Sequence, residues 1–336
     1  MVSILGISLF LSFILSFIAL PKWINISKRV GLVWEDMNKW GHPKNVASSG
    51  GIVVIMAFIL GVFSYIFIKT FIYHDASNIL EIFSLLSVVL ILGIVGLTDD
   101  LLGWKNGGLP AKVRIFLALI ASIPLVVINA GSSIVNIPFL GPTNFGFWYP
   151  LFLIPIGIAG AATTYNFLAG FNGLEAGQGI LILSFLSFVA YSIGTPWLAI
   201  VGFCMVMALI TFYIYNKFPA KVFSGDILTY SIGALIAGMA ILGNFERIAL
   251  FVFIPYILEG ILKLRGGLKK QSFGIPEKNG NLKLPYNKIY GLTHLSIFIL
   301  SKFKKKVTEK DVTYLIFVFQ IIICLITLVV FKDVLI

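Results

Sequence analysis

Residues 79–100 read ILEIFSLLSVVLILGIVGLTDD, a nearly continuous apolar run that ends in two aspartates. About 20 residues of this character, folded as an α-helix, match the thickness of the hydrocarbon core of a bilayer. The apolar residues are continuous rather than alternating, which disfavours a membrane β-barrel. This stretch therefore predicts a membrane-spanning helix with an acidic pair at its carboxyl end.

The composition of the whole chain indicates that many such helices are present. Of its 336 residues, 59% are hydrophobic and only 12% are charged, and the mean hydropathy is +1.00. A soluble globular protein carries about 25% charged residues, so the composition excludes a water-soluble fold and a disordered chain. The apolar content is close to what ten spans of about 20 residues would use.

Apolar runs bounded by charges, glycines or prolines mark ten candidate membrane helices. They cover residues 2–21, 50–73, 79–98, 112–130, 147–167, 176–194, 196–216, 227–243, 248–265 and 311–333. We therefore predict an all-α, polytopic membrane protein with about ten transmembrane helices. A single integral membrane domain is expected to cover residues 1–336.

The basic residues gather on one side of this predicted arrangement. Ten spans leave five loops on the side opposite the termini, at residues 22–49, 99–114, 168–175, 217–226 and 263–310. These loops hold every Lys and Arg except Lys69, Arg247 and Lys332. Because basic loops stay in the cytoplasm, we expect a cytoplasmic active site and extracytoplasmic termini. The net charge of +11 then orients helices and does not indicate a nucleic-acid partner.

Two adjacent aspartates, Asp99 and Asp100, end the third predicted span. Adjacent carboxylates repel each other and contribute little to orienting a chain, so binding a cation or positioning a base is their natural use. Asp226 begins the eighth predicted span on the same face. The alternatives are a solvated helix end for the pair and an ordinary N-cap for Asp226.

The predicted loop between the fifth and sixth spans brings Asn166, Asn172 and Glu175 to the same face. Glycines and alanines between them let the backbone approach a ligand closely, although turn chemistry is the alternative explanation. The rim also carries six basic residues: Lys39, Lys44, Lys112, Arg114, Lys217 and Lys221. Oxygen ligands beside cations suit a magnesium-bound polyphosphate and predict phosphoryl transfer. The sequence has no Walker-type or kinase signature, so ATP hydrolysis is unsupported.

Four strings on this face carry a family resemblance. They lie at residues 36–44, 96–100, 166–178 and 218–226, and the most specific is LAGFNGLEAGQ, which begins at Leu168. The chain resembles the polyprenyl-phosphate N-acetylhexosamine-1-phosphate transferases. It is more similar to the eukaryotic and archaeal branch, which uses dolichyl phosphate, than to the bacterial branch, which transfers phospho-N-acetylmuramoyl-pentapeptide.

The resemblance implies a reaction and its participants. N-acetylglucosamine-1-phosphate would pass from UDP-N-acetylglucosamine to a polyprenyl (dolichyl) phosphate with release of UMP, as the first step of lipid-linked oligosaccharide assembly for N-glycosylation. It implies Mg2+ as the cofactor, with Mn2+ as the alternative ion. The expected partners are the UDP-sugar, the lipid phosphate and membrane lipids, without nucleic acid; a homodimer is left open. Direct displacement is the hypothesis, and a covalent aspartyl phosphate is the alternative.

The resemblance also implies residue roles. Asp226 and Asn166 correspond to metal ligands, and Asp99 and Asp100 to the pair that positions or deprotonates the lipid phosphate. A family lysine that binds pyrophosphate falls near Lys112 and Arg114, and alignment on the SIPL string that follows favours Arg114. The expected substrate-binding residues are Asn38, Lys39, Asn172, Glu175, Lys221 and Phe223, with Phe223 available to stack on uracil.

The last cytoplasmic loop departs from both branches of the family. Residues 272–278 read SFGIPEK, which contains neither the Arg-Pro-Arg-type motif nor the histidine cluster. Basic contacts from this loop would then come from Arg265, Lys269, Lys270 or Lys278. Glu259 precedes Lys263 by about one helical turn, and an intrahelical ion pair is the simpler interpretation.

Two other functions compete with this prediction. One is a bacterial-type transferase that uses another UDP-sugar for a cell-wall precursor. The other is a polytopic transporter or channel, which would place polar groups near the bilayer midplane. Here the acids and amides cluster at helix ends on one face. Short outer loops and a carboxyl terminus without a retention motif favour an archaeal cell membrane over the endoplasmic reticulum.

Overall fold

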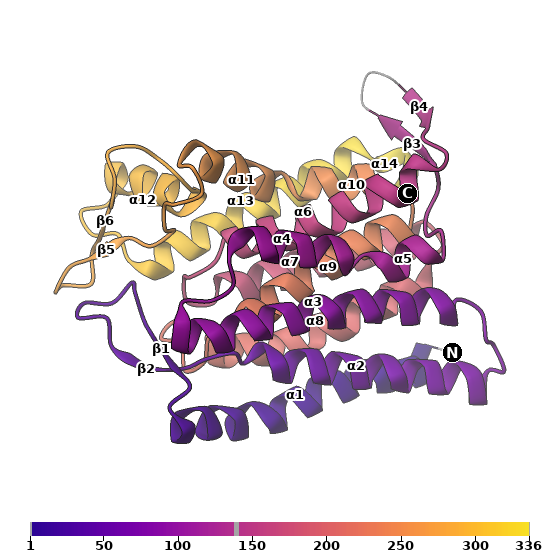
Figure 1. Cartoon of the computed structure of the whole chain (residues 1–336), viewed down its shortest axis with the longest axis horizontal. Helices are drawn as coiled ribbons and strands as arrows, with labels where there is room; N and C mark the ends of the chain where they lie inside the picture. The colour runs from indigo at the N-terminus through magenta and orange to yellow at the C-terminus, as the bar shows by residue number, and fades with distance from the viewer. Residues whose placement is uncertain (1, 138–140, 336) are drawn as a thin grey trace.

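A computed structural model describes residues 2–137 and 141–335, and long helices run side by side through most of it (Figure 1). The two chain ends lie at one end of the helix bundle, and the hairpins β1–β2 and β5–β6 lie at the other (Figure 1). This arrangement is expected of a chain that crosses the bundle an even number of times. The side of the membrane on which each end lies stays a prediction.

Seven helical segments in the described part are long and apolar enough to cross a membrane. They are formed by α1 (Val2–Val30), α2 (Gly51–Phe67) with the π-helical turn η1 (Ile68–Ile72), α3 (Ile79–Asn106), η2 (Tyr149–Leu153) with α6 (Ile154–Phe167), α7 (Leu174–Ser192), α8 (Pro196–Asn216) and α13 (Glu309–Val330). The protein is therefore an integral membrane protein built from helices.

The remaining predicted spans are helical but shorter. Their helices are α4 (Ala111–Ile120), α5 (Ile123–Val127), α9 (Asp226–Leu242), α10 (Glu246–Val252) and α11 (Ile254–Arg265). Each of the two interruptions, between α4 and α5 and between α10 and α11, comes just before a proline, Pro124 or Pro255. Proline lacks an N–H donor and clashes with the preceding turn, which breaks a continuous helix. The total of ten transmembrane helices stays a prediction. Two more short helices, α12 (Leu292–Phe303) and α14 (Lys332–Leu335), lie near the carboxyl end.

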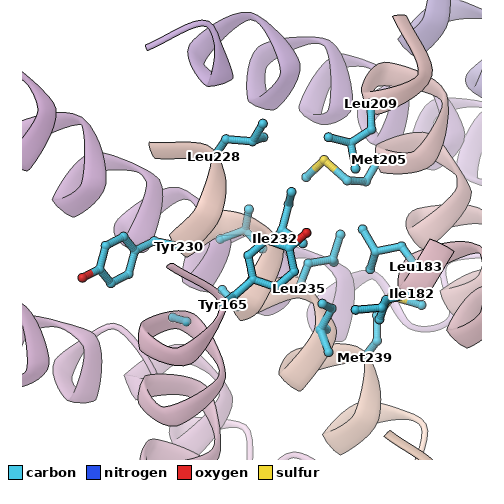
Figure 2. Packing of buried hydrophobic residues seen from close by; sticks show 14 of the residues in the cluster. Tyr165, Ile182, Leu183, Met205, Leu209, Leu228, Tyr230, Ile232, Leu235 and Met239 are labelled. Carbon is cyan, nitrogen blue, oxygen red and sulfur yellow. The ribbon is translucent and has the colours of Figure 1, made fainter. Parts of the chain in front are cut away.

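Helix α9 lies at the centre of the bundle, against α3, α6 and α7. Every residue of α9 except Asp226, Ala237 and Leu242 is buried. Its side chains interdigitate with those of α7 and α8, as Leu235 and Met239 do beside Leu183 (Figure 2). A helix that is hydrophobic all round belongs in such a core.

Glycine lets α3 approach the start of α9. A β-carbon at Gly96 would collide with the backbone of Asp226, so the absence of a side chain at this position permits the contact. The last turns of α3, which carry Asp99 and Asp100, are thereby brought to the first turn of α9. The packing of these two helices builds one side of the site described below.

In the described part of the chain, three short antiparallel hairpins join the helices, and the all-α prediction omits them. They are β1 (Val33–Glu35) with β2 (Lys44–Ala47), β3 (Ile134–Ile137) with β4 (Gly141–Asn144), and β5 (Ile275–Pro276) with β6 (Leu282–Lys283). Strands of two to four residues are too short to show a clear period of two in the sequence. Ala47 also forms a parallel bridge with Val222, which fixes the first loop beside the segment that leads to Asp226.

Candidate active site

A cavity of about 530 Å3 opens at the end of the bundle away from the chain termini. Its walls come from the ends of α3, α6 and α9, from α4, and from the loops that the sequence places on one face. Seven of the predicted site residues line it: Asp99, Asp100, Arg114, Asn166, Glu175, Phe223 and Asp226. Residues that are far apart in the sequence thus meet around one space.

The two adjacent aspartates have different partners. Asp100 accepts hydrogen bonds from the backbone N–H groups of Asp226 (2.7 Å) and Ile227 (3.4 Å). Asp99 accepts one from the Leu109 N–H and another from Arg114 Nη1, at 2.8 Å. Consecutive residues of a helix do not face the same way. Asp100 therefore caps the exposed N–H groups at the start of α9, whereas Asp99 faces the guanidinium.

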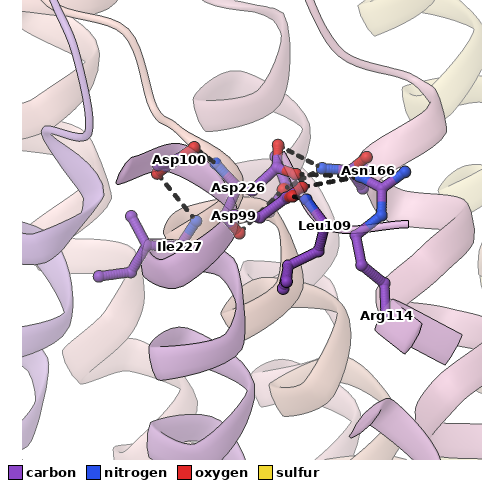
Figure 3. A network of polar contacts seen from close by, with 8 residues as sticks. Asp99, Asp100, Leu109, Arg114, Asn166, Asp226 and Ile227 are labelled. Carbon is purple, nitrogen blue, oxygen red and sulfur yellow. Dashed lines mark hydrogen bonds and ion pairs between the residues drawn. The ribbon is translucent and has the colours of Figure 1, made fainter. Parts of the chain in front are cut away.

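Arg114 is shared between two carboxylates (Figure 3). Its Nη1 atom lies 2.8 Å from Asp99 Oδ2 and 3.5 Å from Asp226 Oδ2. The other oxygen of Asp226 accepts a hydrogen bond from Asn166 Nδ2 at 2.8 Å, and the same amide nitrogen lies 2.9 Å from Thr229 Oγ1. One cation facing two acids leaves this part of the cavity with an excess of negative charge, which attracts a further cation.

The donor set suits a metal that is bound together with its substrate. Within the described residues, no three His, Cys, Asp or Glu side chains form a metal-binding group. Mg2+ commonly uses one or two protein carboxylates and completes its octahedron with water and substrate phosphates. Asp99 and Asp226 each direct one carboxylate oxygen toward Arg114 Nη1, and Asn166 adjoins Asp226; carboxylate and amide oxygens are ligand types that fit such an ion. Its presence stays a prediction.

The loop between α6 and α7 is closed by its own polar groups. Glu175 is buried, and its carboxylate accepts a hydrogen bond from the Gly170 N–H at 2.7 Å. The hydroxyl of Tyr165 donates to the Glu175 carbonyl at 2.7 Å. Gly173 has a φ of +80° immediately before α7, a conformation that glycine adopts without strain. The glycine pattern of this string therefore sets a loop shape that holds Glu175 at the cavity.

Two predicted substrate-binding amides connect loops instead of lining the cavity. Asn172 accepts a hydrogen bond from the Ala220 N–H at 2.6 Å and donates to Glu309 at 2.8 Å and to Asp36 at 3.3 Å. Asn38 donates to the Gly170 carbonyl at 2.9 Å and accepts from the Gly274 N–H at 3.1 Å. The structure places both side chains where they hold neighbouring loops together.

Three predicted basic residues also lie away from the cavity wall. Lys39 forms an ion pair with Asp36 at 2.5 Å, and its ammonium group lies 5.2 Å from the centre of the Phe218 ring. Lys112 and Lys221 are exposed. Of the two candidates for a pyrophosphate contact, only Arg114 lines the cavity. The substrate roles of all these residues stay predictions.

The wall formed by the end of α11 and the loop that follows it contains residues that the sequence assigned to other roles. Lys263 lines the cavity, donates hydrogen bonds to Ser272 Oγ (2.7 Å) and to the Lys270 carbonyl (2.9 Å), and lies 3.9 Å from Glu259. Lys270 lines it as well, whereas Arg265, Lys269 and Lys278 do not. The expected pair of Glu259 and Lys263 is present. The spacing of four residues predicted this ion pair, and for that reason the sequence indicated no role for Lys263 in the site.

Known proteins are similar to this chain over most of its length. Residues 82–244 match the family described as glycosyl transferase family 4. A Saccharolobus solfataricus protein named as a UDP-N-acetylglucosamine–dolichyl-phosphate N-acetylglucosaminephosphotransferase is 35% identical and covers 88% of each chain. One of the same name from Sulfolobus acidocaldarius is 34% identical over 91% of each. A Streptococcus agalactiae phospho-N-acetylmuramoyl-pentapeptide-transferase is 30% identical over 74% of this chain and 76% of its own.

Proposed function

Because the chain belongs to glycosyl transferase family 4, we propose that it transfers N-acetylglucosamine-1-phosphate from UDP-N-acetylglucosamine to a membrane polyprenyl phosphate of the dolichyl type. UMP is released, and the lipid-linked sugar begins oligosaccharide assembly for N-glycosylation. The observation that carries this proposal is the convergence of Asp99, Arg114, Asn166 and Asp226 in one cavity at the ends of membrane helices. The names of the two archaeal relatives supply the donor and acceptor.

The proposed reaction is a displacement at the β-phosphorus of the UDP-sugar. An oxygen of the lipid phosphate forms a bond to this phosphorus while the bond to the bridging oxygen of the leaving UMP breaks. Atoms and charge balance without a further reactant. Such a transfer depends on positioning and on neutralising the phosphate oxygens, and Arg114 is the cavity residue whose guanidinium supplies fixed positive charge beside the two acids.

Asp226 and Asp99 would hold a magnesium ion, with Asn166 beside them. When bound, this ion supplies charge neutralisation at the pyrophosphate; Mn2+ is the alternative. Asn166 orients Asp226 through its amide hydrogen bond. Asp100 acts through the backbone: its bonds to the N–H groups of Asp226 and Ile227 fix the direction in which α9 enters the cavity.

The location of the cavity supports the rest of the proposal. A water-soluble nucleotide sugar meets a lipid phosphate at the membrane surface, so a site at helix ends gives access to both. We infer that ten helices cross a cell membrane, that the cavity faces the cytoplasm and that both termini lie outside. The one-sided distribution of Lys and Arg in the sequence supports this topology.

A reconstituted assay tests the function. The full chain in liposomes would receive Mg2+, dolichyl phosphate and, in separate reactions, UDP-N-acetylglucosamine, other UDP-hexosamines and UDP-N-acetylmuramoyl-pentapeptide, and UMP release would be measured. We expect UMP from UDP-N-acetylglucosamine in the largest amount. Preference for the pentapeptide donor would establish the bacterial-type reaction instead. Uptake of intact UDP-sugar by a folded preparation, without UMP from any donor, would indicate a transporter.

A further inference from the structure

The loop between α6 and α7 contributes to a second cavity as well as to the first. Gly170 and Glu175 line the large cavity, whereas Asn172 lines a smaller one of about 180 Å3. The other walls of the smaller cavity come from the end of α8, from Phe218 after it and from the first turns of α13. None of its lining residues lines the large cavity. It is therefore a separate site on the same end of the bundle.

Two lysines give the smaller cavity a positive charge. Lys217 directly follows α8 and Lys310 lies in the first turn of α13, and both are exposed. Among the described residues neither lysine forms an ion pair. The ammonium group of Lys310 lies 5.0 Å from the centre of the Phe218 ring. The nearby carboxylate of Glu309 is hydrogen-bonded to Asn172 and does not line the cavity, so the lining itself favours an anion.

A buried hydroxyl in the same wall lacks a partner. Thr313 lines the cavity and is only 3% exposed, and its Oγ1 atom forms no hydrogen bond with any described residue. Buried polar atoms in proteins are nearly always hydrogen-bonded. An oxygen of a ligand held between the two lysines would accept this hydrogen bond. The hydroxyl is thus a second observation that points to an anionic ligand rich in oxygen.

The surroundings indicate that the anion is attached to a lipid. Tyr213 and Tyr314 line the cavity, and both rings contact Phe317, at centroid distances of 6.4 and 6.3 Å. One or two helical turns further into the predicted membrane, exposed apolar side chains continue the same faces of the two helices: Ile210 and Ile214 on α8, and Val318 and Ile321 on α13. A free phosphate would use only the polar part of this surface.

We propose that the smaller cavity binds the phosphate headgroup of an anionic membrane phospholipid. Lys217 and Lys310 neutralise the phosphate, the Thr313 hydroxyl donates to one of its oxygens, and the acyl chains lie along α8 and α13. Basic pockets between membrane helices are suited to lipid headgroups. Because Asn172 forms part of both this cavity and the loop that carries Glu175, the bound lipid would also stabilise that loop.

Native mass spectrometry of the full chain in a neutral detergent tests the proposal without any transfer reaction. The probes are dioctanoyl-phosphatidylglycerol, dioctanoyl-phosphatidylcholine and inorganic phosphate. We expect one tightly retained phosphatidylglycerol. Its affinity should fall about tenfold or more in Lys217→Ala/Lys310→Ala, since each lysine near a headgroup contributes appreciably, and should fall less in Thr313→Val. The control Lys28→Ala/Lys288→Ala removes two exposed lysines outside the cavity and should bind as the unmodified chain does.

Each alternative outcome contradicts the proposal in a different way. Equal retention by Lys217→Ala/Lys310→Ala, in a preparation whose Tm is unchanged, would place the lipid elsewhere. Displacement of phosphatidylglycerol by an equal concentration of inorganic phosphate would indicate a free-phosphate site. Equal retention of phosphatidylcholine, whose phosphate is neutralised by its own choline cation, would show that the site does not select an anionic headgroup.

Discussion

Arg114 in the large cavity is paired differently from the polar residues at the opposite end of the bundle. At the end near the chain termini, Lys69 donates to Ser77 and forms an ion pair with Asp75 at 2.7 Å, and Tyr149 donates to Glu246. Each of these groups has its own partner. At the cavity end, Arg114 is shared by two acids. Closed pairs stabilise a fold, whereas a shared cation leaves charge available for a ligand.

The largest effect is expected at Asp226, where the cavity has its excess negative charge. Asp226→Ala should lower kcat by at least about 1000-fold, because the variant loses a proposed metal ligand and the partner of Asn166. UMP release from reconstituted protein measures the loss, and Tm in detergent checks folding. The matched control is Asp75→Asn at the opposite end, which should keep normal turnover. Near-normal activity of Asp226→Ala would mean that the proposed metal site is misplaced.

The second largest effect on catalysis is expected at Arg114. Arg114→Ala should lower kcat/KM by about 100-fold, since the fixed cation beside the reacting phosphates is removed. Lys112→Ala is the control, because that side chain is exposed and lies outside the cavity. The activity of this variant should stay within about twofold of that of the unmodified chain. Steady-state kinetics with varied UDP-N-acetylglucosamine measure both. A larger loss in Lys112→Ala would transfer the pyrophosphate role to that residue.

Asp100 should show an intermediate effect and a different signature. Asp100→Asn keeps one oxygen for the N–H groups of α9 but loses the charge that favours the helix N-terminus. We expect kcat to fall about tenfold and the free energy of unfolding to fall by about 1 kcal/mol. Kinetics and thermal unfolding of the same preparation measure the two changes. Loss of turnover as complete as in Asp226→Ala, at unchanged Tm, would mean that Asp100 contacts the reacting atoms.

The smallest effect is expected at Asp75, and only in acid. The hydrogen bond from Lys69 lowers the pKa of Asp75 from 3.8 to about 2. A carboxyl whose pKa is lowered by folding stabilises the folded protein at any pH above the pKa that it has in the unfolded chain. This contribution is lost as the pH falls through the lowered pKa of the folded state. Asp75→Asn should therefore reduce Tm slightly at neutral pH, and the difference should disappear near pH 2. A difference in Tm that does not change with pH would contradict this.

The sequence predicted the positions of the helices better than their continuity. Long apolar runs are sufficient to locate α2, α3 or α8, because the bilayer selects for length and hydrophobicity. The break between α4 and α5 depends on Pro124, which an average over a long apolar window does not weigh. The hairpins were missed because each involves only a few residues and is held by pairing between strands, such as that of Val33 with Ala47.

Seven of the predicted site residues line the cavity, but the sequence did not predict the direction in which their side chains point. The two adjacent aspartates were expected to act together, but helix geometry turns Asp99 to Arg114 and Asp100 to the start of α9. Asn172 belongs to a recognisable string, yet its partners include Glu309, which is 137 residues away in the sequence. Such long-range contacts have no local pattern. They determine which polar residues face a substrate and which connect loops.

The burial of α9 has a consequence for how the enzyme responds to its membrane. Helices that touch lipid tilt when bilayer thickness changes, but α9 is enclosed by its neighbours along nearly its whole length. The helix that carries Asp226 should therefore tilt less than the surrounding helices when the bilayer thickness changes. The rate of turnover should therefore vary less with the acyl-chain length of the surrounding bilayer lipids than the rate at which the acceptor lipid enters the site.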